Sequence, residues 1–253
     1  DNRFGLFHEN IPTVYITHQL HIETGIKWLN KIVQQLHYHY INRFTQCWVP
    51  DAEGDKNLAG NLSHPKKMPF IPVKYLGTLS RFKKQESSIT NYLLIILSGP
   101  EPQRSIFENI LLQQLKYFEA SVVLVRGLPA QNNTITLPPK MKVFNHLMAD
   151  DLSKYIQQSA IVLTRAGYSS VMDLATLKQK AVLVPTPGQT EQEYLAVLLK
   201  KQRLFYTCSQ HKFNLQNALN EAKEFYKILP VSPPGFNESI IFSWLEEIQK
   251  TKV

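Results

Sequence analysis

Between residues 70 and 226, short apolar runs alternate with longer stretches of helical periodicity, and this alternation restricts the fold more than any other feature. The expected strands span residues 72–76, 92–97, 121–126, 141–144, 161–164, 181–184 and 203–206. The expected helices span residues 102–118, 149–158, 169–178, 190–202 and 212–226. Strands that alternate with helices of about 10 to 15 residues form βαβ units. The sequence therefore predicts an α/β fold, with helices on both faces of a parallel sheet.

The first part of the chain is organised differently. It contains two short β-rich runs and one helical stretch, at residues 11–17, 46–49 and 24–40. Residues 51–69 lose this periodicity and collect Gly, Asn, Asp and Pro, which is typical of a loop or linker. We therefore expect residues 1–50 to belong to one domain, residues 51–69 to be a linker, and residues 70–235 to form a second domain.

A last helix is expected at the end of the chain, in residues 236–253, after the helix-breaking sequence SPPG. Its pattern is amphipathic, as in helices that pack on a core and in helices that lie on a membrane surface. Its charges are mixed rather than basic, and this favours the packing helix.

The charge balance limits the classes of partner. The chain of 253 residues has a formal net charge of +8, which suits nucleic acid, an anionic membrane surface or an acidic small ligand. Its lysine pairs are scattered and are not interleaved with aromatic residues, so we expect no nucleic-acid partner. The sequence contains no apolar run of about 18 residues that could cross a membrane.

Ligands of parallel α/β sheets bind outside the carboxyl ends of the strands, in the loops that lead into helices. Applied to the expected strands, this rule selects four segments. They are Ser98 to Arg104, Asn145 to Asp151, Thr164 to Ser170 and Pro185 to Gln192.

The segment LTRAGYSS, residues 163–170, has two interpretations. Gly167 would allow a tight turn, and a helix starting near Ser169 or Ser170 would offer backbone N–H groups and a dipole to an anion such as phosphate. Alternatively, Ser170 and Asp173 form the S-x-x-D pattern of a capping box. Thr190 and Glu193 fit the same pattern one helix later, so both interpretations stay open.

Two other segments hold candidate residues. The loop LSGPEPQR, residues 97–104, has a single glycine and matches no nucleotide-binding glycine motif. Its Arg104 could pair with a phosphate or solvate the face of a helix. In ITHQL, residues 16–20, His18 stands at the end of a strand, where a histidine can act as a general base or have a structural role.

Taken together, these segments resemble the C-terminal donor domain of the GT-B nucleotide-sugar glycosyltransferases, and in particular the family of UDP-N-acetylglucosamine transferases that form lipid II. The resemblance lies in Leu163 to Asp173 (LTRAGYSSVMD), in Val184-Pro185, and in Gln192 to Ala196 (QEYLA). It covers about residues 70 to 250, and extends more weakly over 1–50 through ITHQL. It implies two Rossmann-like domains of GT-B type, the N-terminal one incomplete, with the last helix crossing back to it.

The resemblance also implies roles for individual residues. Asp173 would hold the ribose, and Leu147 would present a backbone group to the uracil. The diphosphate would face Ser98, Gly99, Arg165, Gly167, Tyr168, Ser169 and Ser170. The donor sugar would meet Gln189, Gln192 and Glu193. His18 would face the acceptor as a candidate catalytic base.

The sequence departs from the family pattern at three of these positions. Asp173 replaces a glutamate, which shortens its reach by one methylene. Glu193 replaces a glutamine, which puts the identity of the sugar in doubt, and Leu195 replaces an asparagine. The glycine-rich loop of the N-terminal domain is missing, so we expect this chain alone to be inactive.

The implied function is transfer of a sugar from a UDP-sugar to a hydroxyl group of a lipid-linked or glycan acceptor, in cell-envelope glycan or glycolipid synthesis. The UDP-sugar is a substrate, and we expect no cofactor and no bound metal. The expected location is the cytoplasm, with peripheral association at the inner face of the membrane. Two alternatives stay open: a UDP-sugar 2-epimerase or nucleotide-sugar hydrolase, and a non-catalytic subunit that binds nucleotide sugars.

Overall fold

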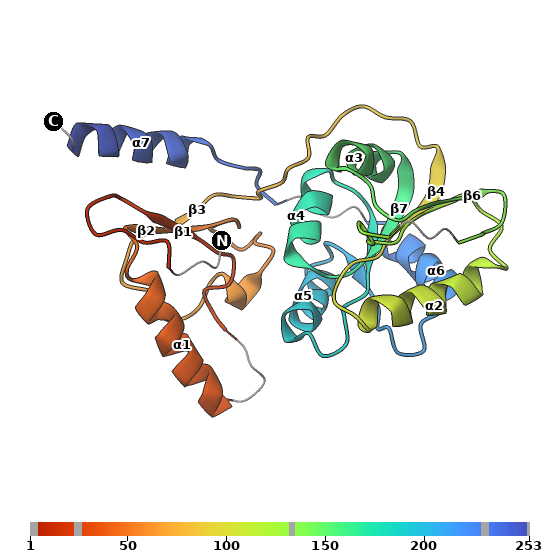
Figure 1. Cartoon of the computed structure of the whole chain (residues 1–253), viewed down its shortest axis with the longest axis horizontal. Coiled ribbons are helices and arrows are strands. Elements are labelled where there is room, and N and C mark those ends of the chain that lie inside the picture. Colours follow the sequence, from red (N-terminus) through yellow and green to blue (C-terminus); the bar gives the residue numbers. More distant parts are fainter. Residues whose placement is uncertain (1–4, 23–26, 132–134, 229–232, 252–253) are drawn as a thin grey trace. The chain divides into compact units, whose positions relative to one another are not determined.

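Two parallel sheets organise the computed structural model of the chain, which describes residues 5–22, 27–131, 135–228 and 233–251 (Figure 1). Each sheet belongs to its own compact unit. Unit 1 consists of Asp1–Leu79 and Pro233–Val253, and unit 2 of Ser80–Ser232.

Unit 2 is built on a six-stranded sheet in the order β6-β5-β4-β7-β8-β9, in which all neighbours are parallel. Its strands are β4 (Asn91–Ile96), β5 (Val122–Val125), β6 (Met141–Phe144), β7 (Ser159–Thr164), β8 (Ala181–Leu183) and β9 (Tyr206–Thr207). Its helices are α2 (Gln103–Leu115), α3 (Ala149–Gln157), α4 (Tyr168–Thr176), α5 (Thr190–Lys201) and α6 (Leu215–Phe225). Counted from β4, the strand order is the doubly wound order 3-2-1-4-5-6. The α/β fold with a parallel sheet that the alternation predicted is confirmed.

The strands of unit 2 are apolar along their length because both faces of the sheet are covered. Leu93 and Ile95 of β4 point into a core formed with α2 and α6. Leu94, between them, is equally buried and points to the opposite face. Figure 1 shows α3 on one side of this sheet and α2 and α6 on the other. Parallel strands buried on both faces show this continuous apolar pattern.

Unit 1 is built on the three-stranded parallel sheet β1-β2-β3. The strands are β1 (Val14–Ile16), β2 (Gln46–Val49) and β3 (Val73–Tyr75). Its helices are α1 (Lys27–Ile41), the short 3-10 helix η1 (Gly60–Leu62) and α7 (Ser239–Thr251). The part of the expected first helix at 24–26 lies outside the described residues.

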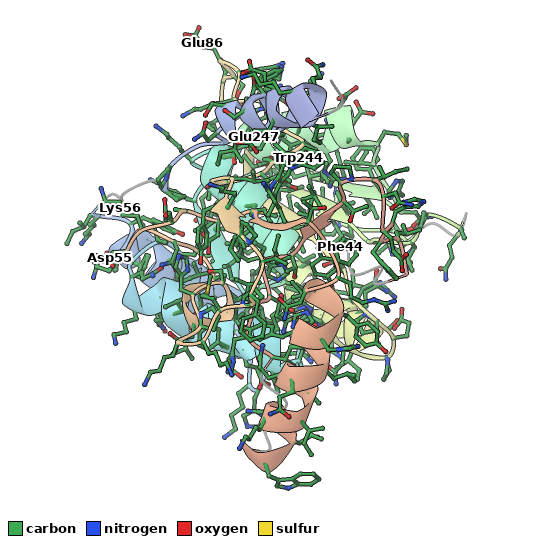
Figure 2. The ribbon with its side chains drawn as sticks, turned by 90° about the vertical axis from the view of Figure 1, so that its left-hand side faces the viewer. Phe44, Asp55, Lys56, Glu86, Trp244 and Glu247 are labelled. Atoms are coloured by element: carbon green, nitrogen blue, oxygen red, sulfur yellow. The ribbon has the colours of Figure 1, made fainter. Side chains whose placement is uncertain are left out.

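Aromatic side chains form much of the core of unit 1. Tyr15 of β1 packs on Phe44, with ring centroids 5.1 Å apart, beside Tyr38 of α1. Phe44 lies just beyond the end of α1, and Trp244 lies on α7 (Figure 2). The Trp244 ring meets that of Trp48 of β2 edge to face, with centroids 5.3 Å apart. α7 therefore packs on unit 1, and the contact buries Trp48, which is 6% exposed.

The segment 51–69, expected as a linker, is a folded part of unit 1. Asp51 is fully buried, and its carboxylate accepts hydrogen bonds from the backbone N–H groups of Ala52, Leu58 and Ala59 at 2.7 to 3.0 Å. The hydroxyl of Ser63 donates a fourth, at 2.7 Å. These four hydrogen bonds hold the loop in one conformation around the carboxylate. A composition rich in Gly, Asn and Asp does not distinguish such a loop from a linker.

The boundary between the units also differs from the expected one. Strand β3, expected to open the second domain, pairs with β2 in unit 1. Unit 2 therefore begins at Ser80 rather than residue 70. A strand's apolar pattern predicts the strand but not its partner, because pairing is decided by residues distant in sequence.

The two stretches of unit 1 meet where the chain leaves and re-enters it. Thr78 donates hydrogen bonds from its backbone N–H and its hydroxyl to the Pro234 carbonyl, at 3.2 and 2.8 Å. Gly77 has a φ of +75°, and a Cβ there would lie 2.1 Å from the Gly235 carbonyl oxygen. Only glycine fits this close approach.

Candidate functional site

The candidate site lies at the carboxyl ends of β4, β7 and β8, in unit 2. The strand order reverses between β4 and β7, and at such a switch point the loops diverge and leave a crevice for a ligand. Three loops lead from these strands into α2, α4 and α5. They comprise residues 97–102, 165–167 and 184–189. Most site residues predicted from the sequence lie on these loops or in the first turns of these helices.

The start of α4 excludes the capping box. The helix begins at Tyr168, its N-cap is Gly167, and no side chain caps it. Ser170 and Asp173 lie inside the helix, so they cannot form the predicted pair. The backbone N–H groups of Ser169 and Ser170 have no acceptor within the described ranges of the chain. This helix start therefore offers open donors and a positive dipole end to an anion.

Glycines border this start in two different ways. Gly167 has an ordinary φ of −71°, so the tight turn that the sequence suggested does not require glycine there. A Cβ at Gly167 would meet nothing within 4 Å, which leaves room for a ligand to approach the helix end. Gly99, in the loop after β4, has a φ of +101°, a conformation that favours glycine. Ser98 and Gly99 are both exposed.

Arg165 does not point into open space, as a direct contact with a ligand would require. The side chain is 1% exposed. Its guanidinium donates to the carbonyl oxygens of Gln103 at 2.9 Å and, more weakly, of Val184 at 3.4 Å and Pro185 at 3.5 Å. It also lies over the Phe107 ring, 4.4 Å from the centroid. Burial lowers the pKa of Arg165 from 12.5 to about 10, and the side chain stays charged at neutral pH.

Asp173 lies on α4 one turn beyond Ser169, with 13% of its side chain exposed. The hydroxyl of Ser80 donates to its Oδ1 at 2.6 Å, and Nε of Arg81 lies 3.6 Å from its Oδ2. Burial raises the pKa of Asp173, while the Ser80 hydrogen bond and the Arg81 charge act in the opposite direction. No local pattern could have predicted Ser80 or Arg81 as partners of Asp173, because about 90 residues separate them from it.

The side chains at the start of α5 hold the loop in front of it. Oε1 of Gln192 accepts from the backbone N–H of Thr186, and Oε1 of Glu193 accepts from that of Gly188, both at 3.0 Å. Gln192 also bonds to the Gln189 side chain. The N-cap is Gln189 rather than Thr190, so the second capping box is not formed either.

Sequence comparison identifies the domain that carries these loops. The model of the glycosyltransferase family 28 C-terminal domain matches residues 84–227, which is more than half of the chain. The chain belongs to glycosyltransferase family 28. No curated protein matches the chain.

Solved structures agree with this membership at the level of the fold. The glycotransferase of kitacinnamycin aligns with a TM-score of 0.58 and 13% identity, over 85% of this chain and 62% of its own length. CalG4, the calicheamicin glycosyltransferase, gives 0.53 and 13% identity over 84% and 58%. Acinetobacter baumannii MurG gives 0.50 and 16% identity over 85% and 58%. The fold of this family 28 chain is therefore of GT-B type, and the chain spans about three fifths of each of these proteins.

Two predicted residues of the family 28 chain lie apart from the three loops. Leu147 follows β6, so it also lies at the carboxyl ends of the strands of unit 2, but beyond β5 from the three loops, and it is half-buried. His18 follows β1 and belongs to unit 1. Tyr168 lies in the first turn of α4, but its side chain is buried.

Arg104 belongs to a buried charge cluster beside the site, so both interpretations of it from the sequence are wrong. Arg104 neither faces solvent nor is available to a phosphate, because it is 6% exposed and pairs with Glu101 at 2.6 Å and Glu108 at 3.0 Å. Glu108 is shared with Arg126, at the end of β5, whose guanidinium also donates to Asn145 at 2.8 Å. The spacing of Arg104 and Glu108, four residues apart on one helix, is a signal that could have predicted this pair.

Two further observations concern ligands and membranes. In the described ranges, no three His, Cys, Asp or Glu side chains are grouped so that they could hold a metal ion. None of the helices within those ranges has both the length and the apolar character needed to span a membrane.

Proposed function

We propose that this chain takes part in the transfer of a sugar from a UDP-sugar to a hydroxyl group of a lipid-linked or glycan acceptor, in cell-envelope glycan or glycolipid synthesis. Membership of glycosyltransferase family 28 supports glycosyl transfer. The donor, the acceptor and a location at the inner face of the cytoplasmic membrane are parts of the proposal. The basic character of the chain, with a pI of about 9.3, suits such a surface.

One observation carries the choice of a nucleoside diphosphate. α4 presents the open N–H groups of Ser169 and Ser170 at its start and the carboxylate of Asp173 one turn later. Residues four apart lie on the same face of a helix, about 6 Å along its axis. A diphosphate at the helix start would therefore place a ribose within reach of the carboxylate. Ribose hydroxyls would replace the Ser80 hydroxyl and the Arg81 guanidinium as partners of Asp173.

The remaining residues have roles in the same arrangement. The backbone beyond β6 at Leu147 would meet the base, and Ser98 and Gly99 would approach the phosphates from β4. Gln189, Gln192 and Glu193 would meet the donor sugar.

In the transfer step, the acceptor oxygen bonds to the anomeric carbon as the bond from that carbon to the UDP oxygen breaks. The hydroxyl proton passes to a base, for which His18 is our candidate. The negative charge that develops on UDP is stabilised by the donors and dipole of α4.

Titration calorimetry with UDP, and with Asp173→Asn, tests the proposal. If the carboxylate holds the ribose, the variant should bind UDP about tenfold or more weakly, because charge-assisted hydrogen bonds contribute about 1.5 to 3 kcal/mol. The variant should lose much less affinity for 2′-deoxy-UDP, because that ligand lacks the 2′-hydroxyl and so already lacks part of the contact with the carboxylate. Glu224→Gln, a carboxyl-to-amide change on the exposed end of α6, is the control and should leave both affinities unchanged.

Two results would contradict the proposal. One is an absence of UDP binding by the unchanged chain at millimolar concentration. The other is an equal loss for UDP and 2′-deoxy-UDP in Asp173→Asn. Separately, free UDP or epimerised sugar formed efficiently from a UDP-sugar without an acceptor would indicate a hydrolase or epimerase.

A further inference from the structure

Arg165 differs from the other buried arginines of unit 2 in having no counter-ion. Arg104 and Arg126 share the carboxylate of Glu108. Arg165 is more deeply buried than either, yet it pairs with no carboxylate of the described chain. Its partners are three carbonyl oxygens and the face of Phe107, and its Nε has no hydrogen-bond partner in the part of the chain that the structure describes. The loops after β4, β7 and β8 therefore enclose an uncompensated positive charge.

This charge is central to the candidate site. The side chain starts at the carboxyl end of β7, reaches the first residue of α2 through the Gln103 carbonyl, and reaches the loop after β8 through Val184 and Pro185. It thus connects all three loops of the switch point.

A second buried polar atom in these loops also lacks a partner. The hydroxyl of Thr186 has no hydrogen-bond partner among the described residues, and it lies 3.7 Å from the position that a Cβ on Gly99 would occupy. Polar groups buried without partners are unusual in proteins, and each calls for an explanation such as an absent ion or ligand.

We propose that Arg165 is a positioning residue for the donor diphosphate, which it stabilises from beneath the loops by its charge without touching it. The proposal rests on the proposed function. A buried cation with no acid beside it is costly in the free protein. A diphosphate bound at the start of α4, three residues after Arg165 in the chain, supplies the missing negative charge. Arg165 should therefore contribute to the affinity for UDP, which carries the phosphates, and not to the affinity for uridine, which lacks them.

The test compares UDP, UMP and uridine in binding titrations of the whole chain and of two variants. Arg165→Met removes the charge, whereas Arg165→Lys keeps the charge but loses the planar guanidinium. We expect Arg165→Met to weaken UDP binding about tenfold or more, UMP binding less, and uridine binding by no more than about twofold. Arg165→Lys should recover most of the UDP affinity, because attraction between charges depends on distance more than on the shape of the cation.

Arg203→Met is the control for the loss of an arginine at an exposed position away from the site. Arg203 also lies over a phenylalanine ring, Phe225, at 5.0 Å, and donates to a backbone carbonyl at 3.1 Å. It precedes β9, so it lies at the amino ends of the parallel strands, whereas the site lies at their carboxyl ends. Its loss should leave the ratio of UDP affinity to uridine affinity unchanged.

A purely structural brace would give a different pattern, with equal losses for UDP, UMP and uridine and no recovery in Arg165→Lys, and this would overturn the proposal. If Arg165→Met does not fold, Arg165→Lys decides alone. A lysine variant that binds uridine normally but has lost most of its affinity for UDP would also overturn the proposal. If the unchanged chain binds no UDP, the proposed function fails. If it binds UDP and Arg165→Met does so equally well, only this inference fails.

Discussion

Asp51 in unit 1 and Arg165 in unit 2 are both buried charges that closely follow a parallel strand, yet their surroundings are opposite. The carboxylate of Asp51 accepts hydrogen bonds from three backbone N–H groups and one hydroxyl, all in its own loop. Arg165 has carbonyl partners but no acid, and the helix that follows it begins with open N–H groups.

The difference separates two uses of a polar loop. Donors and acceptors that satisfy each other stabilise the loop itself, because unpaired buried groups cost far more than paired ones contribute. The loop around Asp51 is therefore complete without a ligand. Loops that leave charge and donors unpaired are ready to bind a partner of opposite charge. A change in one region, with stability and UDP affinity both measured, tests this contrast.

The largest effect is expected for Asp51→Ala, which leaves four buried donors without their acceptor. We expect a loss of about 3 to 5 kcal/mol from the free energy of unfolding of unit 1. Tryptophan fluorescence in urea measures this unit alone, because Trp28, Trp48 and Trp244 all belong to it. UDP affinity, measured by calorimetry under native conditions, should not change. Asp55→Ala, at an exposed position of the same loop, is the control.

A second effect is expected on acidification, through His37. Burial lowers the pKa of His37 from 6.5 to about 4, so between these values the unfolded chain binds a proton that the folded chain does not. Stability therefore falls as the pH falls through this window. Unit 1 should lose about 3 kcal/mol by pH 4, at 1.36 kcal/mol for each pKa unit. The gap between the unchanged chain and His37→Gln, followed by tryptophan fluorescence, should narrow with acid, and a constant gap would contradict this assignment.

The smallest effect on stability is expected for Gly167→Ala. The backbone at Gly167 suits any residue, and the added methyl would meet no atom of the chain. Stability should fall by only about 1 kcal/mol, because glycine is preferred over alanine at the N-cap of a helix. UDP affinity should fall severalfold because the methyl occupies the approach to the helix start. Gly54→Ala, in an equally open position of unit 1, should change neither. Unchanged UDP affinity in Gly167→Ala would place the ligand elsewhere.

The elements of the fold could be predicted from the sequence because they depend on local pattern. Apolar runs such as 92–97 and 161–164 coincide with β4 and β7 to within two residues at each end. The first strand, expected at 11–17, is shorter and lies at Val14–Ile16. The last strand is displaced. It was expected at 203–206 and lies at Tyr206–Thr207, because Arg203 adopts a positive φ in the turn before it.

The site could be predicted only in part. Its loops followed from the rule for parallel sheets, and the segment from Gly167 to Asp173 carried the resemblance. The partners of Asp173 and the absence of a counter-ion at Arg165 could not be predicted, because they depend on which distant segments fold together. A capping pattern such as Ser170 to Asp173 is also ambiguous in the sequence, since it specifies a spacing but not where the helix begins.

The path of the chain through its two units has a consequence for the order of folding. Unit 1 consists of two stretches, and the chain between Leu79 and Pro233 builds the whole of unit 2. Joining the ends of a flexible excursion of about 150 residues would cost about 4.5 kcal/mol in chain entropy. That cost is met within unit 2 as it folds, after which α7 can bring Trp244 onto Trp48. We therefore expect the contact between Trp244 and Trp48, which joins the two stretches of unit 1, to form after unit 2 has folded.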